Sequence, residues 1–269
     1  MNEFIGHHRL KYKSEVIFER RRRILRETRK LIAQRGYAGF SVRELCERAS
    51  IAQKTLYNAF DNKENVIAAA IREYMAEFND RTIYRFDVQT LDGRLERLIK
   101  VHSRNIQIKP YTSAIMAVYN APGADRAVRG AIKNVADVGL RPFAEALETS
   151  KALAVGATAS SLIHLLTTST YAVLTDWCLG EIPDVDLVDR VSEIFLLIVV
   201  GATKGQVRAD ARRWLQDVRG QRASWIALRK LAEAPRAKSM EVVRERLGGQ
   251  RSPETAEAPD PAGRVRSVA

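Results

Sequence analysis

The chain has 269 residues, of which 46% are hydrophobic and 28% charged, and its formal net charge is +12. This composition is that of a globular protein and excludes collagen-like, low-complexity and wholly disordered chains. The two cysteines, Cys46 and Cys178, lie too far apart for a Cys-x-x-Cys motif, and no apolar leader precedes them. We therefore expect no disulfide scaffold, no metal site and a cytoplasmic location.

Positive charge is concentrated at the two ends of the chain. Residues 1–60 hold 14 Lys and Arg against 6 Asp and Glu, residues 61–204 hold 16 against 18, and residues 205–269 hold 14 against 8. Basic ends joined to a near-neutral middle are typical of a protein that binds a polyanion and has another task in its body. Nucleic acid is the first candidate partner, and an acidic membrane surface is the second.

Apolar residues recur at spacings of three and four along the first 200 positions, which predicts an almost entirely helical chain. The first helix is expected at 14–35, ending before Gly36, which suits a left-handed C-cap. Its inward residues are predicted to be Val16, Ile24, Leu25, Leu31 and Ile32. Its first half carries a run of four basic residues: Arg20, Arg21, Arg22 and Arg23.

Two short helices, predicted at 42–49 and 53–60, meet across a three-residue break, which is the spacing of a helix-turn-helix. Ser41 and Glu44 have the spacing of a capping box that starts the first of them. Two side chains of the second helix are predicted to pack against the first helix: Leu56 and Phe60. Its outward side chains are of the kinds that contact phosphates and base edges in a major groove, namely Gln53, Lys54, Thr55, Tyr57 and Asn58.

A connector helix is expected at 63–85, followed by a helical body. The body helices are predicted at 91–108, 110–120, 124–149, 152–180 and 187–204. One further basic helix is predicted at 207–233, and the segment after it is poor in large apolar residues and expected to be disordered. The predicted domains are thus a head at 14–62, a body at 63–206, an additional helix at 207–234 and a tail at 235–269.

The stretch GYAGFSVREL at 36–45, with Ala49-Ser50-Ile51, TLYNAF at 55–60 and Lys63-Glu64, resembles the DNA-binding head of TetR-family transcriptional regulators. The match runs over residues 14–64, whereas the body resembles the family in helix count and in a weak match at 177–182. The resemblance implies an all-α fold. It would consist of a three-helix helix-turn-helix DNA-binding head, a connector helix, and a body that dimerises and encloses a small-molecule pocket.

Several residues take a role in DNA binding from this resemblance. Positions that commonly touch DNA, mostly its phosphates, correspond to Arg43, Thr55, Tyr57 and Lys63. Positions where base contacts are made correspond to Gln53, Lys54 and Asn58, and Asn can pair with adenine through two hydrogen bonds. We add the basic run Arg20, Arg21, Arg22 and Arg23 as candidate phosphate or minor-groove contacts. A solvated helix face is the alternative for that run.

The sequence departs from the family pattern around the turn. Ser50 stands where the family usually has Gly, and Ala52 lacks the usual hydroxyl N-cap of the recognition helix. A non-glycine residue in the left-handed conformation costs roughly 1 kcal/mol, and the loss of an N-cap costs about as much. Cys46, where the family often has Ala, is expected to be a small buried apolar residue.

The body contains an uncharged stretch at 152–175 and the apolar run IFLLIVV at 194–200. The stretch has too many Ser, Thr and His residues for a bilayer span, so we expect buried helices and no membrane. In the family, the last two body helices form an intersubunit bundle. The resemblance therefore implies a homodimer, whose interface we expect to include Leu153, Ala157, Ser160, Ser161, His164, Phe195, Ile198 and Val199.

A pocket for a small-molecule effector is expected among the body helices. Its candidate lining residues are His102, Ile106, Tyr111, Met116, Tyr119, His164, Thr168, Tyr171 and Trp177. This mixture of apolar, aromatic and hydroxyl groups suits a largely apolar effector with one or two polar handles.

The sequence thus predicts a sequence-specific DNA-binding regulator, in the first place a repressor that binds a palindromic operator as a homodimer and is released by an effector. Activation in place of repression stays open. So does a basic architectural DNA-binding or membrane-surface protein without effector response. Motifs of metalloproteases, hydrolases, nucleotide and dinucleotide binding are missing from the sequence, so we expect neither catalysis nor a cofactor.

Overall fold

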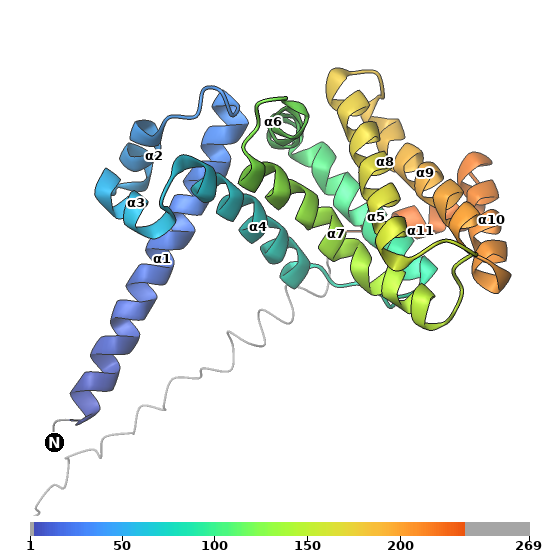
Figure 1. The fold of residues 1–269 in the computed structure, drawn as a ribbon, viewed down its shortest axis with the longest axis horizontal. Coiled ribbons are helices and arrows are strands. Elements are labelled where there is room, and N and C mark those ends of the chain that lie inside the picture. The colour runs from blue at the N-terminus through green and yellow to red at the C-terminus, as the bar shows by residue number, and fades with distance from the viewer. Residues whose placement is uncertain (1–2, 235–269) are drawn as a thin grey trace, which may run out of the picture. The chain divides into compact units, whose positions relative to one another are not determined.

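The computed structural model describes residues 3–234, with side chains from Glu15 onward. This part of the chain folds into eleven α-helices and one short 3-10 helix, and it has no strand beyond a single antiparallel bridge between Leu153 and Thr203. Figure 1 shows how the helices are arranged. The predicted all-α class is confirmed. The tail predicted at 235–269 lies outside the described residues.

The head is built from α1 (Glu3–Arg35), α2 (Val42–Ala49) and α3 (Gln53–Phe60). The bounds predicted for α2 and α3 are confirmed, whereas α1 begins earlier than the predicted residue 14. Gly36 has φ +66° directly after α1, so the left-handed residue predicted there is present.

The core of the head confirms most of the inward face predicted for α1. Ile24, Leu25, Leu31 and Ile32 are buried and pack in one cluster with Leu45, Leu56 and Phe60. The prediction that Val16 faces inward is wrong, because 40% of its surface is exposed. The amino-terminal part of α1 extends beyond α2 and α3 in Figure 1.

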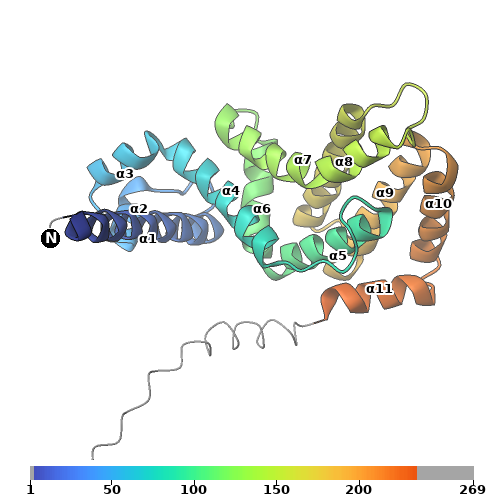
Figure 2. The ribbon, with the colours of Figure 1, turned by 90° about the horizontal axis from the view of Figure 1, so that it is seen from below.

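A connector helix, α4 (Lys63–Arg81), leads from the head into the body. It ends earlier than predicted, and Thr82 is its C-cap. The body helices, which Figure 2 shows from a second side, are α5 (Leu91–Gln107), α6 (Lys109–Asn120), α7 (Arg126–Thr149), α8 (Ala159–Leu179), η1 (Asp184–Asp186) and α9 (Leu187–Ala202).

Helix α8 starts later than the predicted residue 152. Thr158 accepts a hydrogen bond from the backbone N–H of Ser161, whose hydroxyl accepts one from the N–H of Thr158, and this capping box fixes the helix start. The turn before α8 is held by the last residue of α9, since Ala154 N–H donates to the Ala202 carbonyl at 2.9 Å. No helix among residues 3–234 has the length and apolar character needed to cross a membrane.

The prediction of a single helix at 207–233 is wrong. The chain forms α10 (Gly205–Arg219) and α11 (Ala223–Glu233), separated by a turn in which Gln221 has φ 47°. The turn lets α11 double back onto α5, where the Ser103 hydroxyl donates to Glu233 at 3.0 Å. Trp225 of α11 is buried, and its indole N–H donates to the Asp189 carboxylate of helix α9 at 2.9 Å. These two helices are therefore part of the body core.

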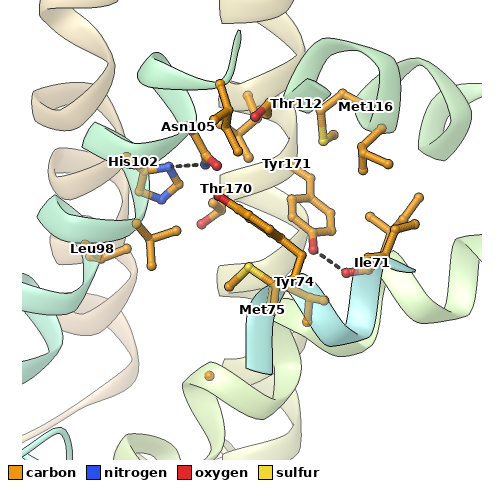
Figure 3. Close-up of a pocket in the computed structure, with 18 of the residues that line it drawn as sticks. Ile71, Tyr74, Met75, Leu98, His102, Asn105, Thr112, Met116, Thr170 and Tyr171 are labelled. Carbon is orange, nitrogen blue, oxygen red and sulfur yellow. Dashed lines mark hydrogen bonds between the residues drawn. The ribbon is translucent and has the colours of Figure 1, made fainter. Parts of the chain in front are cut away.

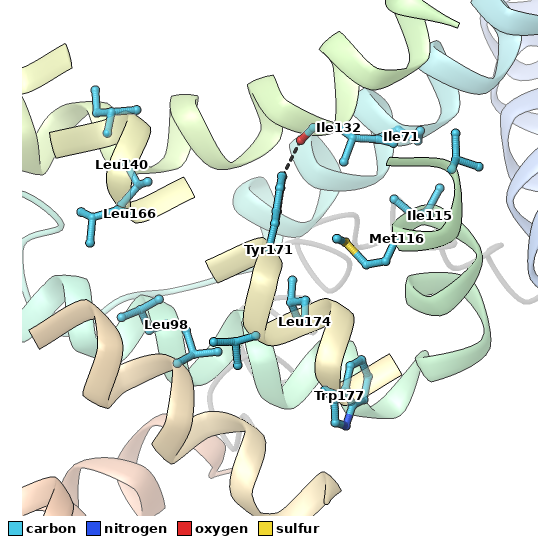
Figure 4. Close-up of a cluster of buried hydrophobic side chains, with 14 of the residues drawn as sticks. Ile71, Leu98, Ile115, Met116, Ile132, Leu140, Leu166, Tyr171, Leu174 and Trp177 are labelled. Carbon is cyan, nitrogen blue, oxygen red and sulfur yellow. Dashed lines mark hydrogen bonds between the residues drawn. The ribbon is translucent and has the colours of Figure 1, made fainter. Parts of the chain in front are cut away.

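The same buried cluster continues through the body around α8, and Figure 4 shows part of it. The Tyr171 hydroxyl donates to the Ile132 carbonyl of α7 at 2.5 Å. Trp177 is fully buried, and its indole N–H donates to Asp184 at 2.8 Å. Because their polar atoms have partners, both aromatic side chains can sit inside an otherwise apolar core.

Candidate DNA-binding surface and ligand cavity

Helix α3 separates its residues into a buried and an exposed face, as the sequence predicts. Leu56 and Phe60 are buried, whereas Tyr57 is 41% exposed. The other outward side chains of the helix, Gln53, Lys54 and Asn58, are also exposed, and Thr55 is half-buried. The helix thus presents a continuous polar surface on a rigid support, which is the geometry that a major-groove reader needs.

Two further predicted contacts flank α3. Arg43 is exposed near the start of α2 and forms an ion pair with Glu47 at 3.1 Å. Such an exposed pair is weak, so the guanidinium can exchange it for a phosphate. Lys63 opens α4, with its Nζ 4.9 Å from the Tyr37 ring centroid. The aromatic contact holds this ammonium beside the amino end of a helix, where anions are favoured.

The four arginines of α1 differ in what they contact. The Arg21 guanidinium lies 4.6 Å from the centre of the Phe60 ring, and Arg23 Nε donates to the Ala49 carbonyl at 2.9 Å. These two therefore brace the helix-turn-helix. Arg22 pairs with Glu19 at 3.7 Å, and Arg20 is exposed.

The turn carries the departures noted in the sequence. Ser50 has φ 50° and ψ 54°, the left-handed conformation that favours glycine, and Ala52 provides no side-chain cap for α3. The capping box predicted at α2 is half formed: Glu44 N–H donates to the Ser41 hydroxyl at 3.4 Å, whereas the Glu44 carboxylate pairs with Arg48 one turn on. Cys46 is buried, as predicted.

A cavity of about 130 Å³ lies inside the body, between α4, α5, α6, α7 and α8. One water molecule needs roughly 10–15 Å³ on the same measure, so the space is large enough for a ligand. Of the predicted pocket residues, four line it: His102, Tyr111, Met116 and Tyr171. Figure 3 shows three of them, His102, Met116 and Tyr171, together with Tyr74, Met75, Asn105 and Thr170, which were not predicted from the sequence.

Five residues predicted for the pocket do not line it. Ile106 and Tyr119 pack against the core beside it, and Trp177 lies inside the core. His164 and Thr168 are exposed, because they lie one turn apart on the face of α8 opposite the cavity. The spacing of residues along α8 does not determine which face of this helix is turned toward α5 and α7.

Two cavity residues have unusual polar environments. His102 is 3% exposed, and burial together with the positive charge of Arg94 lowers its pKa to about 3. The imidazole is therefore neutral, and its Nδ1 accepts a hydrogen bond from Asn105 Nδ2 at 3.2 Å. The Tyr111 hydroxyl is buried without a hydrogen-bond partner among the described residues, and burial raises its pKa.

The sequence analysis missed two charged residues of the cavity, Arg94 and Arg97 of α5. Both line it, and each is only 7% exposed. Arg94 Nη1 donates to the Gly139 carbonyl of α7 at 2.8 Å, and Arg97 Nη1 donates to the Tyr84 hydroxyl at 2.8 Å. A sequence alone assigns arginine to solvent, because arginine is seldom fully buried, and no local pattern contradicts that default.

Helix α4 touches both the cavity and the head. Ile71, Tyr74 and Met75 form one wall of the cavity. On its other side α4 packs against α1, where Arg29 pairs with Glu73 at 2.9 Å and with Glu77 at 3.6 Å.

The predicted dimer residues fall into two groups. Leu153, Phe195 and Val199 are buried within the protomer; Phe195, for instance, packs on Phe143 with 5.8 Å between ring centroids. The others lie at the surface or half-buried: Ala157, Ser160, Ser161, His164 and Ile198. The large apolar side chains that α8 and α9 expose are different ones: Leu165 at 51%, Leu179 at 73% and Leu197 at 43%.

No cluster of three or more His, Cys, Asp or Glu side chains suited to a metal ion occurs in the described part of the chain.

Comparison with known proteins agrees with this geometry. Residues 24–70 match the family model of bacterial regulatory proteins, tetR family. Comparison with curated protein sequences finds no relative of this chain.

Two solved structures resemble the fold. One is assigned to the TetR family and comes from Rhodococcus sp., with a TM-score of 0.52 and 18% identity over 67% of this chain and 98% of that one. The other is the full-length TetR regulator TylP from Streptomyces fradiae, with a TM-score of 0.51 and 14% identity over 76% of this chain and 98% of that one. At these identities the likeness concerns the fold. The family resemblance of the sequence is thus confirmed.

Proposed function

We propose that this chain, whose amino-terminal head is a helix-turn-helix domain of the tetR family, is a homodimeric repressor that binds a palindromic operator and is released by a small molecule in the body cavity. The observation that carries the proposal is the exposed polar face of α3, whose opposite face packs into the buried core of the head. Function follows from this site, because a fold by itself does not imply one.

On the DNA side, α3 enters the major groove. Gln53, Lys54 and Asn58 reach base edges, where amide and ammonium groups discriminate among bases. The flanking residues that hold the register on phosphates are Arg43, Thr55, Tyr57, Lys63 and, from α1, Arg20 and Arg22.

On the dimer side, the outward face of α8 and α9 carries exposed Leu165 and Leu197 beside small and hydroxyl side chains. Large apolar residues on a free helix face favour burial against another protein surface. A second copy of the same face gives a two-fold dimer, which in turn presents two equivalent heads to two half-sites of a palindrome.

On the effector side, the wall formed by α4 links the cavity to DNA binding. A ligand that fits the cavity better in one position of α4 shifts the population toward the matching position of α1 and the head. The head at 14–62 and the body at 63–206 then act as two coupled units, with α10 and α11 as additional cover for α5 and α9.

The first experiment is selection of bound sequences from a random DNA pool, with the enriched duplexes retested at about 0.15 M salt. We expect one palindrome. The variant Thr55→Ala/Tyr57→Ala/Asn58→Ala should lose selective binding, whereas Arg141→Ala, which removes an exposed charge on α7, should keep it.

A charge-only binder is the competing function, favoured by the basic head and its basic run. It would give no enriched motif, equal binding by the triple variant, and binding that vanishes as salt rises. That set of results would refute the proposed function.

A further inference from the structure

Two positive charges are buried on one side of the body cavity. Arg94 and Arg97 lie one turn apart on α5, so their side chains share a helix face, and both line the cavity. A buried charge is costly unless it is paired with an opposite charge and hydrogen-bonded.

Neither guanidinium has such a partner within the described side chains. No carboxylate oxygen there lies within 4.0 Å of either one, and each makes a single hydrogen bond to a neutral oxygen, at Gly139 or at Tyr84. The Arg94 Nε is buried and has no hydrogen-bond partner in this part of the chain. Since a guanidinium has five N–H donors, most of the donor capacity is unused.

The two side chains converge at one point of α7. Arg94 bonds the carbonyl of Gly139, and a Cβ at the same glycine would come within 2.9 Å of Arg97 Nη2. The absence of a side chain at Gly139 thus makes room for Arg97. Two adjacent guanidiniums with unused donors form a site for a planar or tetrahedral oxyanion.

The remaining walls of the cavity are mainly apolar. They include Leu98, Val101, Ile115, Met116, Ile132 and Leu140. The Tyr111 hydroxyl, which is buried and has no hydrogen-bond partner among residues 15–234, adds one more hydrogen-bonding group. The cavity therefore combines two cationic side chains with a mainly apolar lining.

We propose that the cavity binds an amphipathic anion, whose carboxylate or phosphate head contacts Arg94 and Arg97 and whose apolar body lies among Leu98, Ile115 and Met116. That this anion is also the effector rests on the proposed function. The binding site itself does not.

The charge state of the site agrees with an anionic ligand. Burial and the neighbouring Arg97 lower the pKa of Arg94 to about 9, so the guanidinium is still protonated at neutral pH. An anion would compensate the charge that burial disfavours, and the affinity should accordingly fall above about pH 9.

The test uses straight-chain probes of equal length that differ only in the head group: decanoate, decyl phosphate and decanol, with hexyl and octyl series for chain length. Calorimetry on the full chain should show at least one anion binding ten or more times tighter than decanol. The tighter of the two anions identifies the head as carboxylate or phosphate.

Substitution locates the head. Arg94→Met and Arg97→Met should each reduce the preference for the anion over decanol to less than threefold, while Arg94→Lys keeps part of it. Arg141→Met, at an exposed position, is the matched control and should bind as the wild type does. The unfolding midpoint of Arg94→Met without ligand should rise, because a buried uncompensated charge is removed, so lost binding would not reflect lost folding.

Three results would each overturn the anion site: no binding by any anion, equal binding of decanol and the anions, or an unchanged preference in both methionine variants. If instead the anion binds but does not release the selected duplex, the site stands and the effector role fails. Absence of a selected duplex would count against the proposed function alone, since the probes bind without DNA.

Discussion

The guanidinium carbon of Arg29, on α1, lies 5.8 Å from the ring centroid of Tyr74, on α4. The Tyr74 ring also lines the cavity, and its hydroxyl accepts a hydrogen bond from Arg104 of α5 at 2.9 Å. Tyr74 of the connector helix therefore contacts α1 of the head and α5 of the body, and it lines the cavity. This contact is one direct physical connection between the cavity and α1 of the head.

Removing that connection should weaken coupling more than DNA binding. In Arg29→Met, the palindromic duplex should still bind, whereas the anionic probe that releases the wild type should release it less, with a loss of about 1 kcal/mol from the coupling free energy. Fluorescence anisotropy with and without probe measures both quantities. Arg26→Met, which alters an exposed arginine of the same helix, is the control; equal coupling in both variants would contradict this route.

The turn of the head should respond to substitutions with opposite signs. Ser50→Gly should raise the free energy of unfolding by about 1 kcal/mol, because Ser50 has φ 50°. Ser41→Ala should lower it by about 1 kcal/mol, because the Ser41 hydroxyl caps α2. Urea denaturation of both variants tests the pair, and a destabilised Ser50→Gly protein would show that the left-handed residue is not strained.

The buried His102 should make the protein acid-sensitive. Its folded pKa is about 3, below the ordinary value of about 6.5, so between these values the unfolded chain binds more protons and stability falls as pH falls. This contribution is complete at neutral pH and is lost progressively below about pH 6.5.

The measurement compares His102→Leu with the wild type at pH 7 and pH 5. The wild type should lose about 2 kcal/mol more stability over this interval than the variant, at about 1.4 kcal/mol per pH unit. Parallel losses in the two proteins would mean that His102 already titrates near its ordinary pKa in the folded state.

The exposed apolar face of α8 and α9 should govern assembly. Leu165→Arg should raise the dimer dissociation constant at least tenfold, because it would bury a charge in the proposed interface. Val155→Arg, at a fully exposed position in the turn before α8, is the matched control. Sedimentation velocity separates monomer from dimer, and an unchanged dimer in Leu165→Arg would place the interface elsewhere.

Local chemistry made the head predictable. The bounds of α2 and α3, the left-handed Gly36 and the inward Leu56 and Phe60 all follow from capping residues and from spacing within a few turns. These signals act over short distances in the chain, so one sequence contains them completely.

The sequence predicted most helices of the body, but it did not predict which helices pack against one another. The turn that precedes α8 is held by the Ala154 contact with Ala202, and the break before α11 is stabilised by the packing of α11 on α5; both contacts join distant parts of the chain. For the same reason, Phe195 was assigned to a dimer interface although Phe143 covers it within the protomer.

The sequence by itself determined an all-helical chain with a helix-turn-helix head and an exposed polar face on α3, because helix periodicity and caps are local. Only the tertiary structure decided which faces of five helices enclose the cavity, and that Arg94 and Arg97 lie in it. Burial is a property of what the rest of the chain places around a residue. The charge that distinguishes this cavity therefore became visible only when α5 was seen packed against Gly139 of α7.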